Sequence, residues 1–478
     1  MNADNFIDGV WRPSLDGETR PAHSPIDGAV IGSIAWSDRA TAILAIEAAR
    51  RAQPRWRAVS LWERARICRR IAEAIRSEAA PLAGLLCLEQ GKPIAEARFE
   101  VGKAADGFDL AADLVRFIEG ATIPTEDPRK RVMTFYQPRG VYAVITPWNF
   151  PVNIPVEYLA PGIAAGNTVV WVPAPTTSLV AVGLARILEQ ADLPPGVINL
   201  VTGAGAVVGD EIVAHRGTDA VGFTGSPVTG RRICERAAGK PLLMEMGGNG
   251  PVIILPDADL EAAAAATASG CFVNAGQVCS SSERIIVHQA IHDEFAERMV
   301  AAAREVKLGD PRQSGITMGP LNNPGVAEKV ALHVDDALAR GARALTGGGA
   351  ATDMPSPLYF QPTVLDRVPA DSLINREETF GPVAPLVAVA DDDQAIRLAH
   401  DNPYGLVSSV FTRDLDRAFR FVETLPTGIV NINDTSNYWE LHIPFGGISG
   451  KESGIGRIGG KHSLIAMSDL KTATFTVK

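Results

Sequence analysis

The chain has few cysteines, and no two of them have the spacing of a metal-ligand pair. Its 478 residues include only five, which are Cys68, Cys87, Cys234, Cys271 and Cys279. An odd number without a Cys-x-x-Cys pair is typical of neither a disulfide framework nor a zinc site. The eight histidines are scattered along the chain. We therefore expect no metal site.

Basic residues and long apolar runs are also scarce. The formal net charge is -10, whereas nucleic acids and anionic membranes attract clustered Lys and Arg. No apolar run approaches the roughly 20 residues that span a bilayer, and residues 1–11 carry two acids and no signal-like pattern. We therefore expect a cytoplasmic protein with neither nucleic acid nor membrane among its partners.

Apolar residues make up 46% of the chain and charged residues 21%, which is ordinary for a globular enzyme of roughly three structural units. Residues 38–118 are predicted to be helical, with Ser37-Asp38 as an N-cap. The run Glu89-Gln90-Gly91-Lys92-Pro93 ends one of these helices. Residues 129–137 lie between proline-rich turns, and their side chains alternate in character. This pattern predicts an exposed strand that needs a partner.

From Gly140 onward, short apolar strands alternate with helices, which predicts a parallel sheet. The expected strands are 141–146, 168–172, 197–201 and 220–223, and the expected helices are 155–165 and 179–190. A second series follows the glycine pair at 247–248. Its expected strands are 251–255 and 284–288, and its expected helices are 260–271, 292–307, 327–340 and 391–400.

Residues 347–357 are expected to form a loop. Residues 469–477 alternate again and could pair with 129–137, in the same subunit or in another.

One thiol stands in a glycine-punctuated turn, Asn274-Ala275-Gly276-Gln277-Val278-Cys279. Upstream, Met244-Glu245-Met246-Gly247-Gly248-Asn249 offers a single carboxylate between apolar residues and a glycine pair. A thiol and a carboxylate of this kind suit acyl transfer through a thioester, followed by hydrolysis. The alternative is that Cys279 is a small buried hydrophobe, which is the commoner use of a lone cysteine.

Two glycine-containing turns follow expected strands. The run 203–209 has the position of a phosphate-binding loop but not the Gly-x-Gly-x-x-Gly spacing. Phe223-Thr224-Gly225-Ser226 would present backbone donors and a hydroxyl at a helix start, where a pyrophosphate is favoured. For Ser226 an ordinary N-cap is an equally good interpretation.

Thr146-Pro147-Trp148-Asn149-Phe150-Pro151 also ends an expected strand. A side-chain amide fixed between prolines can bind a developing oxyanion, although an asparagine that satisfies a turn is commoner. Glu377-Glu378-Thr379-Phe380-Gly381-Pro382 could be a solvated helix end.

Taken together and in this order, these motifs resemble those of the aldehyde dehydrogenase superfamily. The set consists of Pro-Trp-Asn-Phe-Pro, Phe-Thr-Gly-Ser, Glu-Met-Gly-Gly, Gly-Gln-x-Cys, Glu-Glu-x-Phe-Gly-Pro and Pro-Phe-Gly-Gly. The resemblance extends from about Phe6 to Phe475. It implies an α/β fold with a Rossmann-like cofactor-binding domain, an α/β catalytic domain and a small β oligomerisation arm.

The resemblance implies that Cys279 attacks the aldehyde while Asn149 and the Cys279 amide hold the oxyanion. Hydride transfer to the nicotinamide would leave a thioester, which water activated by Glu245 would hydrolyse. Glu245 would also serve as the base that a thiol with an ordinary pKa of about 8.5 needs at neutral pH. Its presence favours release of a free acid over transfer of the acyl group to coenzyme A.

The expected cofactor is NAD, and NADP stays open. The resemblance assigns its site to Thr146, Trp148, Val172, Pro175, Gly205, Gly209, Phe223, Gly225, Ser226, Gly247, Glu378 and Phe380. Val172 replaces the family's usual lysine, and Pro175 stands where NAD-preferring members often have glutamate. Two further departures are Glu157-Tyr158, where lysine is frequent at the second position, and the slightly longer link at 448–452.

The expected substrate funnel is mostly apolar and aromatic and has no arginine to clamp a carboxylate. It consists of Ile154, Glu157, Val278, Ser280, Tyr438, Trp439, Leu441 and Phe445. This composition favours an uncharged aliphatic, terpenoid or aromatic aldehyde over a semialdehyde acid. The alternative for Tyr438 and Trp439 is that they only pack a loop.

The expected domains follow the family pattern. They are a cofactor-binding domain at 1–120 and 141–246, a catalytic domain at 247–447, oligomerisation strands at 121–140 and 463–478, and a return segment at 448–462. A homodimer or homotetramer is expected. Two alternatives remain, an acylating enzyme that requires coenzyme A and a non-catalytic binding protein on the same fold.

Overall fold

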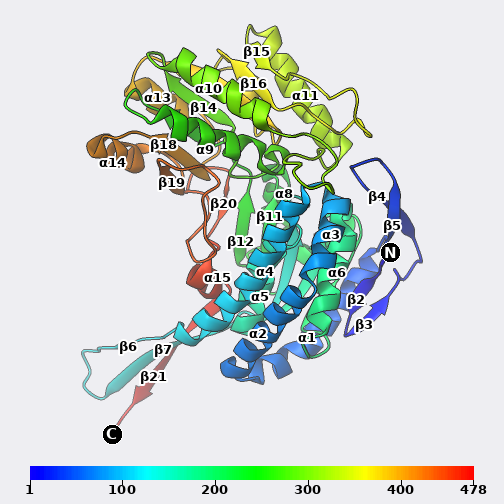
Figure 1. Ribbon diagram of the computed structural model, residues 1–478. Coiled ribbons are helices and arrows are strands. Elements are labelled where there is room, and N and C mark those ends of the chain that lie inside the picture. The colour runs from blue at the N-terminus through cyan, green and yellow to red at the C-terminus, as the bar shows by residue number, and fades with distance from the viewer.

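The computed structural model describes residues 1–478 and contains two large sheets in separate lobes (Figure 1). The first sheet has eight strands in the order β20-β12-β11-β8-β9-β10-β2-β3. Its five central strands run parallel and are β8 (Val141–Thr146), β9 (Thr168–Pro173), β10 (Ile198–Leu200), β11 (Ala220–Gly225) and β12 (Leu242–Met246). The four strands predicted after Gly140 are thereby confirmed.

Helices cover both faces of this sheet, because alternate side chains of each strand point to opposite sides. On one face, Tyr142, Val144 and Trp171 lie in an apolar cluster with five helices. These are α2 (Leu61–Ser77), α3 (Ala79–Gln90), α4 (Ile94–Leu114), α5 (Asn153–Ala165) and α6 (Ser178–Glu189). On the other face, Val141 and Val172 pack with α1 (Arg39–Ala58), α7 (Asp210–Ala214) and α8 (Pro227–Ala237).

The predicted helical region 38–118 consists of α1 to α4 and a short 3-10 turn, η1 (Val115–Phe117). Asp38 caps α1 by accepting the Thr41 amide, and Ser60 caps α2 by accepting the Glu63 amide. Gly91 ends α3 in a left-handed conformation with φ of 97°. Each boundary therefore has a local cause in the sequence.

The second sheet has seven strands in the order β15-β16-β17-β14-β13-β18-β19. Their bounds are β13 Pro251–Ile254, β14 Arg284–His288, β15 Arg343–Thr346, β16 Thr363–Asp366, β17 Val383–Val389, β18 Val407–Phe411 and β19 Ile429–Ile432. The predicted strands at 251–255 and 284–288 are confirmed. The five strands from β15 to β19 were not predicted from the sequence.

Six helices accompany this second sheet. They are α9 (Leu260–Phe272), α10 (His292–Glu305), α11 (Pro324–Ala339), α12 (Leu373–Arg376), α13 (Asp392–His400) and α14 (Leu415–Thr424). Residues of α9, α10 and α11 pack on one face of the sheet, and residues of α13 and α14 pack on the other. The predicted helices 260–271, 292–307, 327–340 and 391–400 are confirmed within a few residues.

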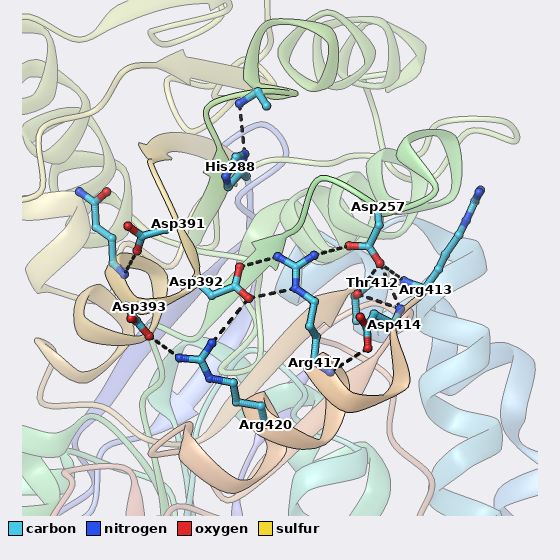
Figure 2. Close-up of polar contacts among 12 residues, drawn as sticks. Asp257, His288, Asp391, Asp392, Asp393, Thr412, Arg413, Asp414, Arg417 and Arg420 are labelled. Carbon is cyan, nitrogen blue, oxygen red and sulfur yellow. Dashed lines mark hydrogen bonds and ion pairs between the residues drawn. The ribbon is translucent and has the colours of Figure 1, made fainter.

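An ion-pair cluster fastens α14 to its neighbours (Figure 2). The Arg417 guanidinium donates to Asp257 at 2.9 Å and to Asp392 at 2.5 and 2.9 Å. Asp257 also accepts the backbone amides of Arg413 and Asp414, which precede α14. The cluster therefore joins the loop after β13 to both α13 and α14.

A three-stranded arm projects from the body near the C-terminus (Figure 1). It consists of β6 (Thr122–Ile123), β7 (Lys130–Pro138) and β21 (Ser468–Thr476), with β21 antiparallel to β7 over nine residue pairs. The predicted pairing of 129–137 with 469–477 is confirmed, and it forms within one chain.

The return to the first sheet is made by a short antiparallel strand. That strand is β20 (Gly454–Ile455), which pairs with β12, and α15 (Gly460–Ala466) leads from it into β21. At the N-terminus, β2 (Asn5–Ile7) and β3 (Val10–Arg12) extend the first sheet. A separate small sheet contains β1 (Asn2–Ala3), β4 (Thr19–His23) and β5 (Val30–Ala35).

Two loop predictions had different outcomes. Residues 347–357 contain no helix or strand, as expected. In the run 203–209, by contrast, Gly205–Gly209 forms a single π-helical turn that continues directly into α7. None of the helices combines the length and the apolar composition that a bilayer crossing requires.

Candidate active site

Cys279 follows a left-handed turn between α9 and β14. Asn274, Ala275 and Gly276 have φ values of 51°, 55° and 70°, so three successive residues occupy a region that side-chain-bearing residues rarely adopt. A Cβ atom on Gly248 would collide with the Cys279 carbonyl oxygen. The Glu-Met-Gly-Gly run after β12 therefore lies directly against the cysteine loop.

Asn149 is buried in the loop between β8 and α5, and it contacts the same turn. Its Nδ2 donates to the Gln277 carbonyl at 3.0 Å. Its own carbonyl accepts from Asn274 Nδ2 at 3.0 Å. A primary amide has two N–H donors, so one donor of Asn149 stays available for another acceptor.

Glu245 lies on β12 and is buried, with 2% of its surface exposed. Neither of its carboxylate oxygens has a well-formed hydrogen bond. Burial raises its pKa well above the ordinary value, the Glu157 carboxylate adds to the rise, and Arg457 and the Ile458 amide oppose it. A buried acid of this kind takes up a proton at a higher pH than an exposed carboxylate does.

The Cys279 thiol is held in its protonated form. Burial raises its pKa to about 12, and the carboxylates of Glu378 and Glu245 add to the rise. The thiolate is the nucleophilic form of cysteine. Cys279 therefore needs a nearby base before it can attack a carbonyl, and Glu245 is close enough to influence its titration.

A second group of predicted residues gathers beside Gly248. Glu378 is buried and accepts the Gly248 amide at 2.9 Å, and a Cβ atom on Gly247 would come within 2.6 Å of the same carboxylate. The rings of Trp148 and Phe380 meet edge to face, with centroids 5.5 Å apart. A carboxylate and an aromatic edge of this kind suit the hydroxyls of a ribose and a flat heterocycle.

Phe380 takes this position because of a further glutamate that was not predicted. Glu283 accepts the amides of Thr379 and Phe380, both at 2.7 Å. These two bonds hold Phe380 at a φ of 61°. The segment Glu377–Pro382, which could have been a solvated helix end, is thus fixed from within the protein.

The predicted pyrophosphate segment lies at the start of α8. Gly225 has no room for a side chain, because a Cβ atom would lie 2.6 Å from the Phe223 ring. Ser226 accepts the Thr229 amide at 3.3 Å and is therefore the N-cap of α8. Both interpretations of Ser226 stay compatible, because Pro227 has no amide N–H and the cap uses that of Thr229, which leaves the Val228 amide for a ligand.

Two predicted cofactor residues have buried side chains, and their contact with a cofactor stays a prediction. Val172 is 1% exposed in the apolar cluster that faces α1, α7 and α8, so it can offer a cofactor only its backbone. Thr146 is buried, and its hydroxyl accepts the Trp171 indole N–H at 2.8 Å. Pro175 begins a partly exposed 3-10 turn, η2 (Pro175–Thr177). Gly205 and Gly209 lie in the π-helical turn before α7.

Several predicted funnel residues share one large apolar cluster with Cys279. Phe445 is a member of this cluster, and Ile154, Trp439 and Cys279 pack against it. Glu157 and Leu441 line one narrow cavity between α4, α5 and α15. Asn153 Nδ2 donates to Glu157 at 3.0 Å, and burial raises the pKa of Glu157 to about 8.

The other funnel residues are held by local contacts. The Trp439 ring lies 5.4 Å from that of Phe445 and donates to the Ile443 carbonyl at 2.9 Å, which agrees with the packing alternative. Tyr438 is 45% exposed and donates to Glu440, and its place in the funnel stays a prediction. Val278 is buried, and Ser280 donates to Asn437 at 2.8 Å.

The chain is similar in sequence and in structure to known proteins. The sequence model described as the aldehyde dehydrogenase family matches residues 11–473. The chain is 39% identical over 468 residues to the succinate-semialdehyde dehydrogenase GabD of Escherichia coli (strain K12), which is NADP(+)-dependent. The match covers 98% of the chain and 96% of that relative.

A glutarate-semialdehyde dehydrogenase of Pseudomonas putida is 38% identical, with 99% of the chain and 97% of the relative covered. Among solved structures, an E. coli NADP-dependent enzyme superposes with a TM-score of 0.97 at 38% identity, covering 100% of this chain and 98% of that one. Betaine aldehyde dehydrogenase of Staphylococcus aureus, solved with NAD+, gives 0.96 at 33% identity, covering 100% and 98%.

Proposed function

The chain belongs to the aldehyde dehydrogenase family and is an NAD(P)-dependent aldehyde dehydrogenase; from this premise we propose that it is of the hydrolytic type and oxidises an uncharged aldehyde. The observation that carries this proposal is the buried carboxylate of Glu245, which has no well-formed hydrogen bond and lies near a thiol that needs a base. An enzyme that passed its acyl group to coenzyme A would have no use for this group as an activator of water.

The proposed chemistry assigns a role to each of the three residues. Glu245 accepts the thiol proton, and Cys279 Sγ bonds to the aldehyde carbon as the carbonyl electrons move to oxygen. The free N–H of Asn149 and the Cys279 amide donate to this oxyanion. When bound, NAD(P)+ supplies the hydride acceptor that makes the step an oxidation to the thioester.

Glu245 releases the thiol proton to solvent after the thioester has formed and then accepts a proton from water, which attacks the thioester carbon. The C–S bond breaks, the sulfur regains a proton and the carboxylic acid leaves. Burial of Glu245 supports both uses of this residue, since its raised pKa brings its proton affinity closer to that of the groups it deprotonates.

We assign the cofactor to the carboxyl end of the first sheet, between two of the proposed domains. Trp148, Gly225 and Ser226 of the cofactor-binding domain would hold it from one side, and Glu378 and Phe380 of the catalytic domain from the other. At the adenosine end, Val172 is buried and Pro175 carries no charge. We propose a preference for NAD, because this end offers no basic side chain to a 2′-phosphate.

The substrate proposal rests on Glu157. The names of the two relatives above specify semialdehydes that carry a carboxylate. In this chain the predicted funnel includes Glu157, whose raised pKa keeps it largely protonated at neutral pH, and no predicted funnel residue is basic. A substrate carboxylate would lose its hydration without gaining a cation, whereas an uncharged chain would not.

A spectrophotometric screen tests the assignment. Benzaldehyde, hexanal and succinate semialdehyde are each offered with NAD+ and with NADP+, with and without coenzyme A. We expect kcat/KM to be at least about tenfold higher for an uncharged aldehyde than for succinate semialdehyde. The Cys279→Ser variant, which should fold normally, is expected to show no turnover.

Preference for succinate semialdehyde would refute the substrate class. A requirement for coenzyme A would refute hydrolysis and support the acylating alternative. Turnover retained in Cys279→Ser would remove the proposed nucleophile, and no reduction of either cofactor by any aldehyde would support the non-catalytic alternative.

A further inference from the structure

A buried lysine lies behind Asn149. Lys92 is fully buried, and its Nζ donates to Glu100 at 2.5 Å and to the backbone carbonyl of Asn149 at 2.8 Å. The same ammonium lies 3.9 Å from the centre of the Phe150 ring. An ammonium has three donors, and here two go to oxygens while the charge also contacts an aromatic face.

The partner of Lys92 holds the other side of the same loop. The second oxygen of Glu100 accepts the amides of Val152 and Asn153, at 2.8 and 3.1 Å. Lys92 therefore binds the loop at Asn149, and Glu100 binds it three and four residues later, where α5 begins. The loop that carries Asn149 is fixed at both ends by one ion pair from α4 and the turn before it.

The cysteine turn is fixed from the same side. Glu96 of α4 accepts the Asn274 amide at 3.0 Å, and Gln90 donates to the Asn274 side chain at 3.1 Å. Asn274 in turn donates to the carbonyls of Asn149 and Gln277. Both loops of the candidate active site are thus attached to one group of polar residues on α3 and α4.

The direction of the free Asn149 N–H follows from these contacts. One N–H is used by the Gln277 carbonyl, and the backbone of Asn149 is held by Lys92 and Asn274. With the amide plane fixed at these points, the remaining N–H can point in only one direction. A preset donor of this kind stabilises an oxyanion without reorganising during the reaction.

We propose that Lys92 is a positioning residue, which through its contact with the Asn149 carbonyl sets the free side-chain N–H of Asn149 for the oxyanion formed at Cys279. This inference rests on the proposed function. The competing explanation is that Lys92 and Glu100 are only a buried ion pair that stabilises the fold.

A double-mutant cycle separates the two explanations. The wild-type protein, Lys92→Met, Asn149→Ala and the double variant are compared in single-turnover formation of reduced cofactor with the best aldehyde of the screen. We expect Lys92→Met to slow this step about 10- to 100-fold in the wild-type background and less than about twofold in the Asn149→Ala background. The dissociation constant of the cofactor should not change.

Lys103→Met is the matched control, because Lys103 lies on α4 one turn after Glu100 and is only partly buried. It should behave as wild type. If Lys92→Met does not fold, Lys92→Met combined with Glu100→Gln removes both charges, and this pair enters the cycle in its place.

An equal loss from Lys92→Met in both backgrounds would overturn the inference, since a structural effect does not depend on Asn149. Wild-type rates for Lys92→Met would overturn it as well. If the wild-type protein itself oxidises no aldehyde, the proposed function fails together with the inference; if only the cycle is additive, the proposed function stands.

Discussion

Glu245 combines burial with two carboxylate oxygens that have no well-formed hydrogen bond. An acid in this state is costly to the folded protein, because desolvation penalises its charged form. Burial also penalises the charged form of Cys279 and raises the pKa of its thiol to about 12. Burial therefore makes the carboxylate of Glu245 a stronger base and the thiol of Cys279 a weaker acid, and both steps of the proposed chemistry begin with a proton passing to Glu245.

Removing the carboxylate tests both steps. We expect Glu245→Gln to lower steady-state turnover about 100-fold or more, because general-base catalysis of this kind contributes that much. Both the formation and the hydrolysis of the acyl-enzyme lose their base, and mass spectrometry of the quenched protein, which detects the adduct at Cys279, shows which of the two steps slows more. Glu235→Gln, at an exposed site on α8, is the control. An unchanged rate with no adduct would contradict the role of Glu245.

The pH dependence has a defined sign. Glu245 accepts protons only as the carboxylate, and its pKa is raised, so lowering the pH through that pKa protonates the base and slows both steps. We expect kcat/KM to rise with pH until Glu245 is ionised and to level off above that point. In Glu245→Gln this dependence should be lost. A wild-type rate that increases as the pH falls would be incompatible with a carboxylate base.

Arg417 shows how α14 is held on the second sheet (Figure 2). Its guanidinium makes two bonds to Asp392 and one to Asp257, and it is only partly exposed. Asp257 also accepts two backbone amides before α14. Planar, bidentate arginine–carboxylate contacts of this kind are stronger than ordinary surface pairs.

We expect Arg417→Ala to lower the free energy of unfolding by about 1–3 kcal/mol. Arg413→Ala should change it by less than about 0.5 kcal/mol, because that side chain is 70% exposed and makes one contact with Asp259 at 3.3 Å. Urea denaturation followed by circular dichroism measures both. Equal effects from the two variants would show that the Arg417 cluster contributes no more than a surface pair.

The projecting arm bears on how whole molecules associate with one another. Its strand β21 pairs with β7 on one side and has no neighbour on the other. Apolar side chains on the arm are exposed, among them Phe135 at 42%, Leu470 at 56% and Phe475 at 49%. A free strand edge with apolar side chains favours association, so we propose that the arm forms the contact of a homodimer or homotetramer.

The combined variant Leu470→Asp and Phe475→Asp should shift the protein toward the monomer, because it places two charges in the proposed contact. Size-exclusion chromatography with light scattering measures the mass. Val30→Asp, at an exposed position in the small N-terminal sheet, should leave the mass unchanged. A wild-type protein that is already monomeric at micromolar concentration would refute the proposal.

Most helices and the first sheet could be predicted because their signals are local. The caps at Asp38 and Ser60 and the alternation of short apolar strands with helices depend on residues within a few positions. The strands from β15 to β19 were missed for a related reason. The sequences of β16, Thr-Val-Leu-Asp, and β18, Val-Ser-Ser-Val-Phe, show no clear alternation, and only pairing with distant strands makes them part of a sheet.

The order of the motifs already identified the family and selected Cys279, Glu245 and Asn149, whose roles stay predictions. That was possible because neighbouring residues determine the chemistry of a side chain and the local conformation of its loop. The buried state of Val172, the bond between Trp171 and Thr146, and the contact of Lys92 with Asn149, 57 residues away, could not be obtained in this way. Burial and hydrogen bonding between remote segments exist only once the sheets and helices have packed together.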